Sequence, residues 1–318
     1  MRETKKYSIN PKRNIGDRVM KNDEPYVAII LLNYNGYDDT VDCVESLLVN
    51  LYKKFTIIIV DNNSTDGSGK KLKQLYDSNL KIQVILNKEN RGFSAGNNVG
   101  IKVALNRGYD DVLLLNNDTI VTKDFLKNII DAQKRYKKLA IYTGKIKYYY
   151  NKNLIWFAGG KYSFFKGSTY HIGIMKEDNG EYDSEKNIEF ICGCYMYMNR
   201  EVIHKIGFLP EEYFLYAEDL DYSLNARGNN VDLKYIPSSV IYHKVSASTS
   251  KLSNLSQFYT VRNRFHLIRK YHCGFFRISA ISFTVLWCLK RIINGKFDAK
   301  TIIKAYRCSK TMKNFKGI

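Results

Sequence analysis

Apolar residues in the first third of the chain fall into short continuous runs. The runs cover 26–33, 55–60, 82–86 and 112–115. Short runs that are apolar throughout are typical of strands buried on both faces of a parallel sheet. The segments between them (38–51, 70–76 and one that starts near residue 94) are expected to be helices. Alternating strands and helices predict right-handed βαβ crossovers, and therefore a mostly parallel sheet with helices on both faces.

The pattern changes after residue 136. The stretches 148–150 and 156–170 are aromatic and rich in glycine, which favours antiparallel strands and loops that cover a cleft. Residues 188–198 are predicted to form one further buried strand, and residues 231–243 two short ones. We therefore expect a loosely ordered, polar lead-in over 1–25, an α/β domain over 26–250 with halves at 26–136 and 137–250, and a helical segment over 251–318.

The net charge of +19 is concentrated in the last segment, where residues 251–318 hold 15 Lys and Arg against one acid, Asp298. This excess favours an anionic partner, such as a membrane surface, a phosphorylated lipid or nucleic acid. Residues 275–289 are apolar, but Arg277 and Lys290 leave only twelve residues between charges, too few for a spanning helix. We predict a helix that lies on an anionic membrane surface. The alternative is a helix packed on the α/β domain or on the second subunit of a homodimer.

Polar residues follow three of the predicted strands at the point where each strand ends. They are 33–36 (NYNG), 61–64 (DNNS) and 116–118 (NND). Ligands of open parallel sheets bind beyond the carboxyl ends of the strands. Turn formation alone explains any one of these segments, because Asn, Asp and Gly favour turns. The three together favour a site for a polar ligand.

Five motifs in a fixed order carry a resemblance to a known family. They are 32–36 (LNYNG), 60–68 (VDNNSTDGS), 90–98 (NRGFSAGNN), 115–118 (LNND) and 216–221 (YAEDLD). In this order they resemble the family 2 glycosyltransferases, and especially their rhamnosyltransferase-like branch, over about residues 26–270. The resemblance implies the GT-A fold and the transfer of a sugar from a nucleotide donor.

The resemblance also implies where the donor binds. The family aspartate that matches Asp61 holds uracil or thymine, so UDP and dTDP both suit this position. Gly92 lets the backbone approach the ligand, Asn97 lies in a helix whose N-terminus favours phosphate, and Arg262 matches an element near the diphosphate. For Arg262 a generic basic helix is the alternative. The expected donor-binding residues are Asn33, Tyr34, Asn35, Asp61, Asn63, Gly92, Asn97, Asn116, Asn117 and Arg262.

A metal site is expected at Asn116-Asn117-Asp118, which takes the place of the family's D-x-D motif with Asn as its first residue. This leaves Asp118 as the carboxylate ligand of Mg²⁺ or Mn²⁺, and one carboxylate is adequate because substrate phosphates supply further oxygens. His243 matches a position where the family often has another ligand. A structural role for this histidine is the alternative.

The acidic motif implies the catalytic base. Inverting transfer needs one base that removes the acceptor hydroxyl proton during attack on the anomeric carbon. By position this base is Asp219, with Glu218 beside it, and Asp221 and Tyr216 are expected at the acceptor. Three acids at a helix start are also explained by the helix dipole, but clustered carboxylates repel one another unless a ligand or cation compensates.

The sequence thus predicts a metal-dependent inverting transferase that acts on a glycan or lipid-linked glycan in cell-surface polysaccharide synthesis. Six cysteines without zinc spacing and a polar start without an apolar stretch indicate a cytoplasmic protein, peripheral at the inner membrane face. A nucleic-acid-binding protein is the first alternative, but no binding signature is present and no nucleic acid partner is expected. A sugar-phosphate nucleotidyltransferase is the second, but it requires a basic Gly-rich loop after the first strand.

Overall fold

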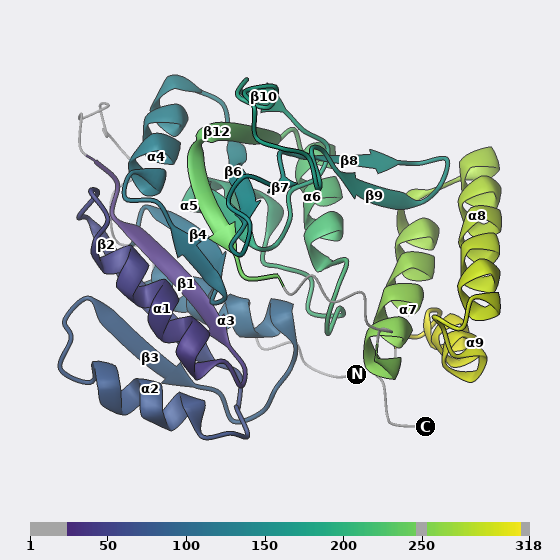
Figure 1. The fold of residues 1–318 in the computed structure, drawn as a ribbon, viewed down its shortest axis with the longest axis horizontal. Helices are drawn as coiled ribbons and strands as arrows, with labels where there is room; N and C mark the ends of the chain where they lie inside the picture. The colour runs from purple at the N-terminus through teal and green to yellow at the C-terminus, as the bar shows by residue number, and fades with distance from the viewer. Residues whose placement is uncertain (1–23, 246–252, 313–318) are drawn as a thin grey trace, which may run out of the picture.

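The computed structural model describes residues 24–245 and 253–312, and one large sheet organises them. The strand order is β10-β12-β6-β11-β4-β1-β2-β3, with β5 beside β12 and β7 beside β6 (Figure 1). The strands are β1 (Val27–Asn33), β2 (Phe55–Asp61), β3 (Ile82–Leu86), β4 (Asp111–Asn116), β5 (Thr119–Val121), β6 (Ala140–Tyr148), β7 (Ile155–Phe157), β10 (Lys186–Asn187), β11 (Tyr195–Asn199) and β12 (Asp232–His243). A separate hairpin joins β8 (Gly160–Ser163) to β9 (Ser168–His171).

The four predicted N-terminal strands are present and parallel. β1 pairs with β2 on one side and β4 on the other, in a register that sets Asn33 beside Asp61 and Leu32 beside Asn116. Every residue of β2 is buried, as the uniformly apolar run predicts. The strand order reverses between β1 and β4, and open α/β sheets bind ligands at such a switch point. The carboxyl ends of these strands therefore position the candidate site.

Helices pack on both faces of the sheet, because the crossovers run in two directions. The connections through α1 (Tyr37–Leu48) and α2 (Ser68–Tyr76) step from β1 outward to β3, whereas α3 (Phe93–Arg107) returns to β4. Right-handed crossovers in opposite directions place their helices on opposite faces. The remaining helices of this domain are α4 (Phe125–Arg135), α5 (Arg200–Ile206) and α6 (Glu218–Gly228). The predicted α/β class, with a mostly parallel sheet of GT-A type, is confirmed.

Two predicted elements are wrong. Residues 188–198 do not form one strand, since only 195–199 join the sheet, as β11, and 188–194 form a buried loop beneath α6. Residues 231–243 form one strand, β12, rather than two. Its pairing with β6 shifts register between Ile236 and Val240, so a bulge accommodates Pro237 and the strand continues.

The basic segment is helical, as predicted, in the part that the structure describes. It contains α7 (Asn254–Tyr271), α8 (Gly274–Ile293) and α9 (Ala299–Cys308), which enclose a small core of their own. Figure 1 shows α8 at the outer edge of the molecule, beyond α7. No helix among 24–245 and 253–312 is long and apolar enough to cross a membrane. The predicted lead-in lies almost entirely outside the described residues.

Candidate active site

Asp61 lies at the end of β2 in a tightly built pocket. Its carboxylate accepts hydrogen bonds from Asn33 Nδ2 (2.7 Å), from the Ser64 backbone N–H (3.0 Å) and from Ser64 Oγ (2.6 Å). A Cβ atom on Gly69 would stand 2.3 Å from Asp61 Cγ, so α2 can begin here only with glycine. A carboxylate has about four lone-pair sites, and these three bonds leave one for a base N–H.

The loops around Asp61 bring other predicted residues to the surface. Asn35 and Asn63 adopt left-handed backbone conformations, with φ of 56° and 63°. Asn35 Oδ1 accepts from the Thr65 backbone N–H (2.8 Å), which joins the two loops. Tyr34 is 49% exposed beside them. These residues frame an open face at the switch point, as predicted.

The predicted metal residues meet across the sheet. Asp118 follows β4 and His243 ends β12, and His243 Nε2 forms a hydrogen bond with Asp118 Oδ2 (3.2 Å) and lies 3.1 Å from Oδ1 without a hydrogen bond to it. Burial by itself would raise the pKa of Asp118, but the hydrogen bond and charge of His243 hold it below its usual value. Asn117 Nδ2 instead donates to Thr40 Oγ1 (2.8 Å), so it braces α1. The Asn116 side chain bonds to the Asp118 carboxylate.

Asp118 and His243 are a partial ligand set. Asp118 Oδ1 is buried and receives no hydrogen bond within the described chain. In 24–245 and 253–312, no three His, Cys, Asp or Glu side chains are arranged to hold a metal. Mg²⁺ commonly takes one or two protein ligands and completes its shell with water and substrate phosphates. The pair therefore fits a divalent cation that arrives with a diphosphate.

The start of α3 is less open than the sequence suggests. Asn97 is 2% exposed and its Nδ2 donates to the carbonyl of Phe93 in its own helix. The Phe93 backbone N–H donates to the Phe214 carbonyl (2.9 Å), which therefore covers the N-terminus of α3. At Gly92, with φ of 89°, a Cβ atom would meet the Phe214 carbonyl oxygen at 2.2 Å. Gly92 thus allows the loop before α6 to pack closely on the N-terminus of α3. Asn97 does not reach the open face.

The acidic motif begins α6 after a strained turn. Tyr216 and Ala217 have φ of 69° and 72°, a region that costs non-glycine residues about 1–3 kcal/mol each. Asp219 accepts from the backbone N–H of Gly193 (3.0 Å) and of Leu220 (2.8 Å). Glu218 is 6% exposed and its Oε2 has no hydrogen-bond partner among the described residues.

The two acids titrate together. Burial, and then the charge of Asp219, raise the pKa of Glu218 to about 8. Burial also raises the pKa of Asp219, while its backbone N–H bonds oppose the rise. Because only Asp219 receives N–H donors from both Gly193 and α6, we assign the negative charge of the pair to Asp219 and the proton to Glu218.

Helix α7 holds the strained turn in place. Asn263 is fully buried, and its Nδ2 donates to the carbonyls of Leu215 (2.8 Å) and Tyr216 (2.6 Å). Arg262 has no exposed surface and donates to the carbonyl of Glu212 (3.3 Å). Arg262 therefore supports the loop before α6. Because its side chain is fully buried there, it does not reach the surface where a diphosphate contact was predicted.

Asp221 is also structural. It is 2% exposed and accepts hydrogen bonds from Tyr213 Oη (2.7 Å), Tyr271 Oη (2.7 Å) and Lys270 Nζ (2.7 Å). These contacts tie α6 to α7. The structure therefore turns Asp221 away from the predicted acceptor contact, whereas Asp219 is only partly buried and lines a cavity.

A cavity of about 460 Å³ opens onto Glu218 and Asp219. The β8–β9 hairpin, α7, α8 and the turn before α6 supply its other walls, including Thr169, His171, Tyr216, Thr260, Arg264 and Trp287. Tyr216 thus lies where an acceptor contact was predicted. Burial lowers the pKa of His171 to about 4, which keeps its imidazole neutral. The Trp156 ring contacts both His171 (4.6 Å between centroids) and His243 (4.9 Å), so one aromatic side chain connects the cavity to the metal pair.

The loop 192–194 lies where the two halves of the site meet. Burial raises the pKa of the Cys192 thiol, and the carboxylates of Asp219, Glu218 and Asp118 raise it further. Gly193 holds Asp219 through its N–H, and the Cys194 carbonyl accepts from the Asn116 backbone N–H (3.0 Å).

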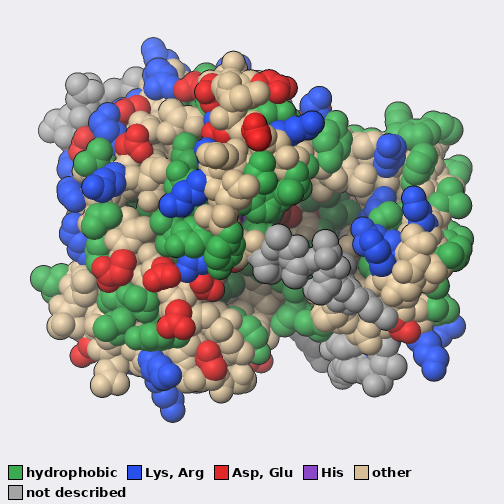
Figure 2. Space-filling model, in the orientation of Figure 1, with side chains coloured by type: hydrophobic (Ala, Val, Ile, Leu, Met, Phe, Trp, Pro, Cys, Tyr) green, Lys and Arg blue, Asp and Glu red, His purple; other side chains and the backbone are tan. Residues whose placement is uncertain are grey.

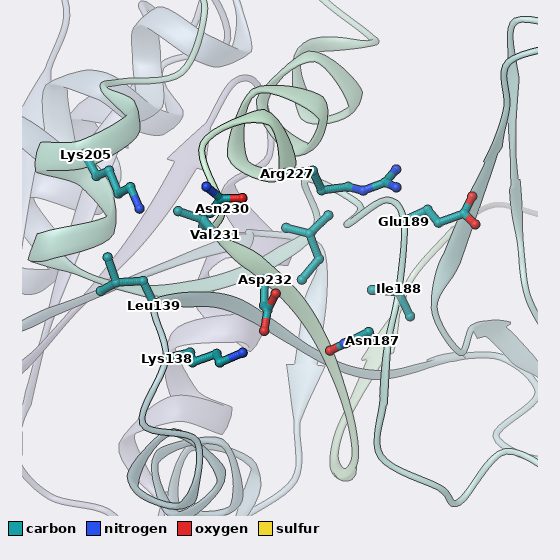
Figure 3. A pocket seen from close by; sticks show the side chains of 11 residues that line it. Lys138, Leu139, Asn187, Ile188, Glu189, Lys205, Arg227, Asn230, Val231 and Asp232 are labelled. Atoms are coloured by element: carbon teal, nitrogen blue, oxygen red, sulfur yellow. The ribbon is translucent and has the colours of Figure 1, made fainter.

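A larger cavity, of about 880 Å³, lies at the opposite edge of the sheet. Figure 3 shows Lys138, Lys205 and Arg227 around it, near the beginnings of β6 and β12. The acidic motif and the metal pair are at the other ends of these strands. The smaller cavity is therefore the candidate acceptor site, because it is the one that contains the acids.

Fold and site together define a glycosyltransferase of the GT-A type. The family model for glycosyl transferase family 2 matches residues 28–207, more than half of the chain, and the chain belongs to this family. A curated relative is the low-salt glycan biosynthesis hexosyltransferase Agl10 of Haloferax volcanii, 25% identical over 75% of this chain and 74% of its own length.

Two solved structures share the fold. GalNAc-T7, in complex with UDP, GalNAc and Mn²⁺, has a TM-score of 0.63 at 13% identity, over 78% of this chain and 48% of that chain. The mannosyltransferase PcManGT of Pyrobaculum calidifontis, in complex with GDP-Man and Mn²⁺, has a TM-score of 0.55 at 14% identity, over 91% and 83%. At these identities the two structures support the fold alone. The family model confirms the predicted family, whereas the rhamnosyltransferase-like branch stays a prediction.

Sequence reasoning missed several residues of the site. Gly69, Gly193 and Asn263 each position a predicted acid, through close packing or a hydrogen bond. His171 and Arg264 line the cavity. Gly69 directly follows the 60–68 motif, and Asn263 and Arg264 directly follow Arg262, so these three were accessible from the sequence. Gly193 and His171 lie in segments without a local signature.

Proposed function

We propose that this protein is an inverting glycosyltransferase that moves a sugar from a UDP or dTDP donor to a hydroxyl of a glycan or lipid-linked glycan, in cell-surface polysaccharide synthesis. The observation that carries the proposal is the loop 192–194, because the Gly193 N–H holds Asp219 and the Cys194 carbonyl accepts from Asn116, two residues before Asp118. One acid belongs to the partial metal site at the donor face, and the other opens onto the cavity. Inverting transfer requires this arrangement, because donor and base stand on opposite sides of the reacting carbon.

Asp219 serves as the base in this proposal. Its two backbone N–H bonds fix the carboxylate and leave about two of its four lone-pair sites for an acceptor hydroxyl. Burial raises its pKa, which brings its basicity closer to what proton abstraction near neutral pH requires. Glu218, protonated at neutral pH because burial raises its pKa to about 8, donates rather than accepts a hydrogen bond.

Asp118 and His243 hold Mg²⁺ or Mn²⁺ in this proposal. A bound divalent cation neutralises charge on the leaving diphosphate. Asp61 binds the uracil or thymine N–H through its remaining lone pair, and Asn33 keeps that carboxylate oriented. The GalNAc-T7 and PcManGT structures each contain Mn²⁺ and a nucleotide or nucleotide sugar, which supports a metal and a donor of this class.

We further propose that α8 docks the enzyme on the cytoplasmic face of an anionic membrane. The side chains that α8 buries are small, namely Ser279, Ala280, Thr284 and Cys288. Its large apolar side chains are exposed instead, namely Phe275, Phe276, Ile278, Val285, Leu286, Leu289 and Ile293. Figure 2 shows apolar side chains along this outer edge, with Lys and Arg nearby. Exposed apolar groups among cations suit an anionic lipid surface, and the face of a homodimer partner is the alternative.

A donor screen tests the function. The protein is incubated with UDP-glucose, UDP-N-acetylglucosamine, dTDP-rhamnose and GDP-mannose, with Mn²⁺, Mg²⁺ or EDTA, and nucleoside diphosphate release is measured. The dTDP-rhamnose arm is included because the motifs resemble the rhamnosyltransferase-like branch. We expect metal-dependent hydrolysis of a UDP or dTDP sugar. Preference for GDP-mannose would contradict the role of Asp61. If the protein neither binds nor hydrolyses any of these donors, the proposed function is wrong.

A further inference from the structure

The acceptor cavity contains a cation that the proposed mechanism does not use. Thr260, Arg264 and Leu267 line the cavity from α7. Their spacing, i, i+4 and i+7, places them on one helical face. Arg262 and Asn263 instead contact the loop before α6. The cavity face of α7 therefore presents one guanidinium toward the space that Asp219 shares.

The Arg264 side chain is held in place but not neutralised. Its Nη2 donates to the Lys166 carbonyl (2.8 Å), and the guanidinium lies 4.9 Å from the centroid of the Trp287 ring. Its Nε is buried and has no hydrogen-bond partner within 24–245 and 253–312. No carboxylate in those ranges lies within ion-pair distance of it. The Arg264 side chain is partly buried, and buried charges are normally paired with an opposite charge or an anionic ligand.

The hairpin beside Arg264 is built to keep this geometry. Gly167, at its turn, has φ of 59°, and a Cβ atom there would meet Ile268 of α7 at 2.9 Å. Ser279 Oγ of α8 donates to the Phe165 carbonyl (2.8 Å). The carbonyl that orients Arg264 is thus fixed by two helices, which keeps the guanidinium in place at the cavity wall.

We propose that the acceptor carries an oxyanion, a phosphate or a carboxylate, that Arg264 binds while Asp219 receives the hydroxyl. This inference rests on the proposed function. The cavity then has an acidic end for chemistry and a cationic end for recognition, and within residues 24–245 and 253–312 no ion pair joins Arg264 to the acids. The volume of about 460 Å³ lies within the range of small-ligand sites, about 300–1,000 Å³. A planar guanidinium with an available N–H suits phosphate and carboxylate geometry.

Binding of simple probes tests the inference. Full-length protein saturated with UDP and Mn²⁺ is titrated calorimetrically with glucose 1-phosphate, methyl glucuronide, geranyl phosphate and the neutral methyl glucoside. We expect at least one anionic probe to bind about tenfold or more tightly than methyl glucoside, the scale of one charge-assisted hydrogen bond. The geranyl phosphate arm distinguishes a lipid-borne phosphate from the soluble sugar phosphate and the carboxylate.

Two variants and a control assign the effect. Arg264→Gln should abolish the preference for the anion, and Arg264→Lys, which keeps charge but loses the fork, should retain part of it. Arg107→Gln removes an exposed charge at the end of α3 and should keep the full preference. Equal binding of all probes by the wild type, or a preference that survives in Arg264→Gln, would overturn the inference. UDP affinity and donor hydrolysis in the same preparations report separately on the proposed function.

Discussion

Asn263 offers the sharpest test of how Asp219, the proposed catalytic base, is positioned. Its Nδ2 bonds two carbonyls in the turn that precedes α6, at Leu215 and Tyr216. Replacement by Ala removes both donors and leaves the α7 backbone unchanged. We expect the turn to relax, because Tyr216 and Ala217 are held in a conformation that costs about 1–3 kcal/mol each.

The effect on the turn follows from the two bonds that the turn loses, whereas the third bond of this side chain, which Asn263 Oδ1 accepts from Arg262 Nε (2.8 Å), lies within α7. A buried acceptor left without its donor costs about 1–3 kcal/mol. Leu215 is half-buried and Tyr216 is exposed, so water replaces part of the loss and the lower value applies. The pair then contributes about 2 kcal/mol, which lowers the population of the catalytic turn about 30-fold. Since Asp61 and Asp118 lie on other elements, UDP affinity should change by less than about threefold.

The assay compares kcat/KM for transfer with calorimetric UDP affinity and the melting temperature. The control is Asn225→Ala, which removes a similar amide bond to the Ile206 carbonyl (2.9 Å) further along α6. We expect this control to lower the melting temperature and retain transfer. If Asn263→Ala transfers sugar as well as the control does, Asn263 stabilises the fold without positioning Asp219, and the argument is wrong.

Four further outcomes test the remaining assignments. Asp219→Asn should lower turnover about 100-fold or more while UDP affinity is kept; loss of activity in Glu218→Gln but not in Asp219→Asn would reverse the two roles. Asp118→Ala, or EDTA, should abolish transfer and weaken UDP binding with folding intact, and full activity in either case would refute the metal assignment. Burial raises the pKa of Glu218 in the folded state from 4.5 to about 8. Its contribution to the free energy of unfolding is therefore complete below pH 4.5 and is lost as the pH rises toward 8. In urea unfolding, Glu218→Gln should lack that part of the pH dependence. Leu286→Glu with Ile293→Glu, on the exposed face of α8, should reduce co-sedimentation with anionic vesicles but not the melting temperature, and unchanged sedimentation would favour a protein partner for this face.

The donor half of the site was predictable because its signals are local. A uniformly apolar run predicts a buried parallel strand, and the polar residue that ends it must lie at the carboxyl edge of the sheet. Asn33, Asp61 and Asp118 were located in this way, and the structure places them at that edge. Burial of Asn97 and Arg262 was not predictable, since the loop that covers α3 and the helix that supports it are remote in the chain.

Local sequence patterns gave the wrong element for two later segments. Residues 190–194 are as buried as a strand but form a loop beneath α6, because burial of a short apolar run does not depend on pairing. In β12, Pro237 and its polar neighbours predict the end of one strand and the start of another. The partner strand β6 tolerates a bulge there, which the sequence of β12 by itself does not reveal.

The sequence by itself determined the family, the sheet and the acids, because each depends on residues that are neighbours in the chain. Only the tertiary structure decided the acceptor cavity, whose walls come from the β8–β9 hairpin and three separate helices. It also decided which face of α8 points outward. The helix has small side chains on one face and large apolar ones on the other, and close packing against α7 and the hairpin selects the small face. The large apolar face remains exposed for that reason.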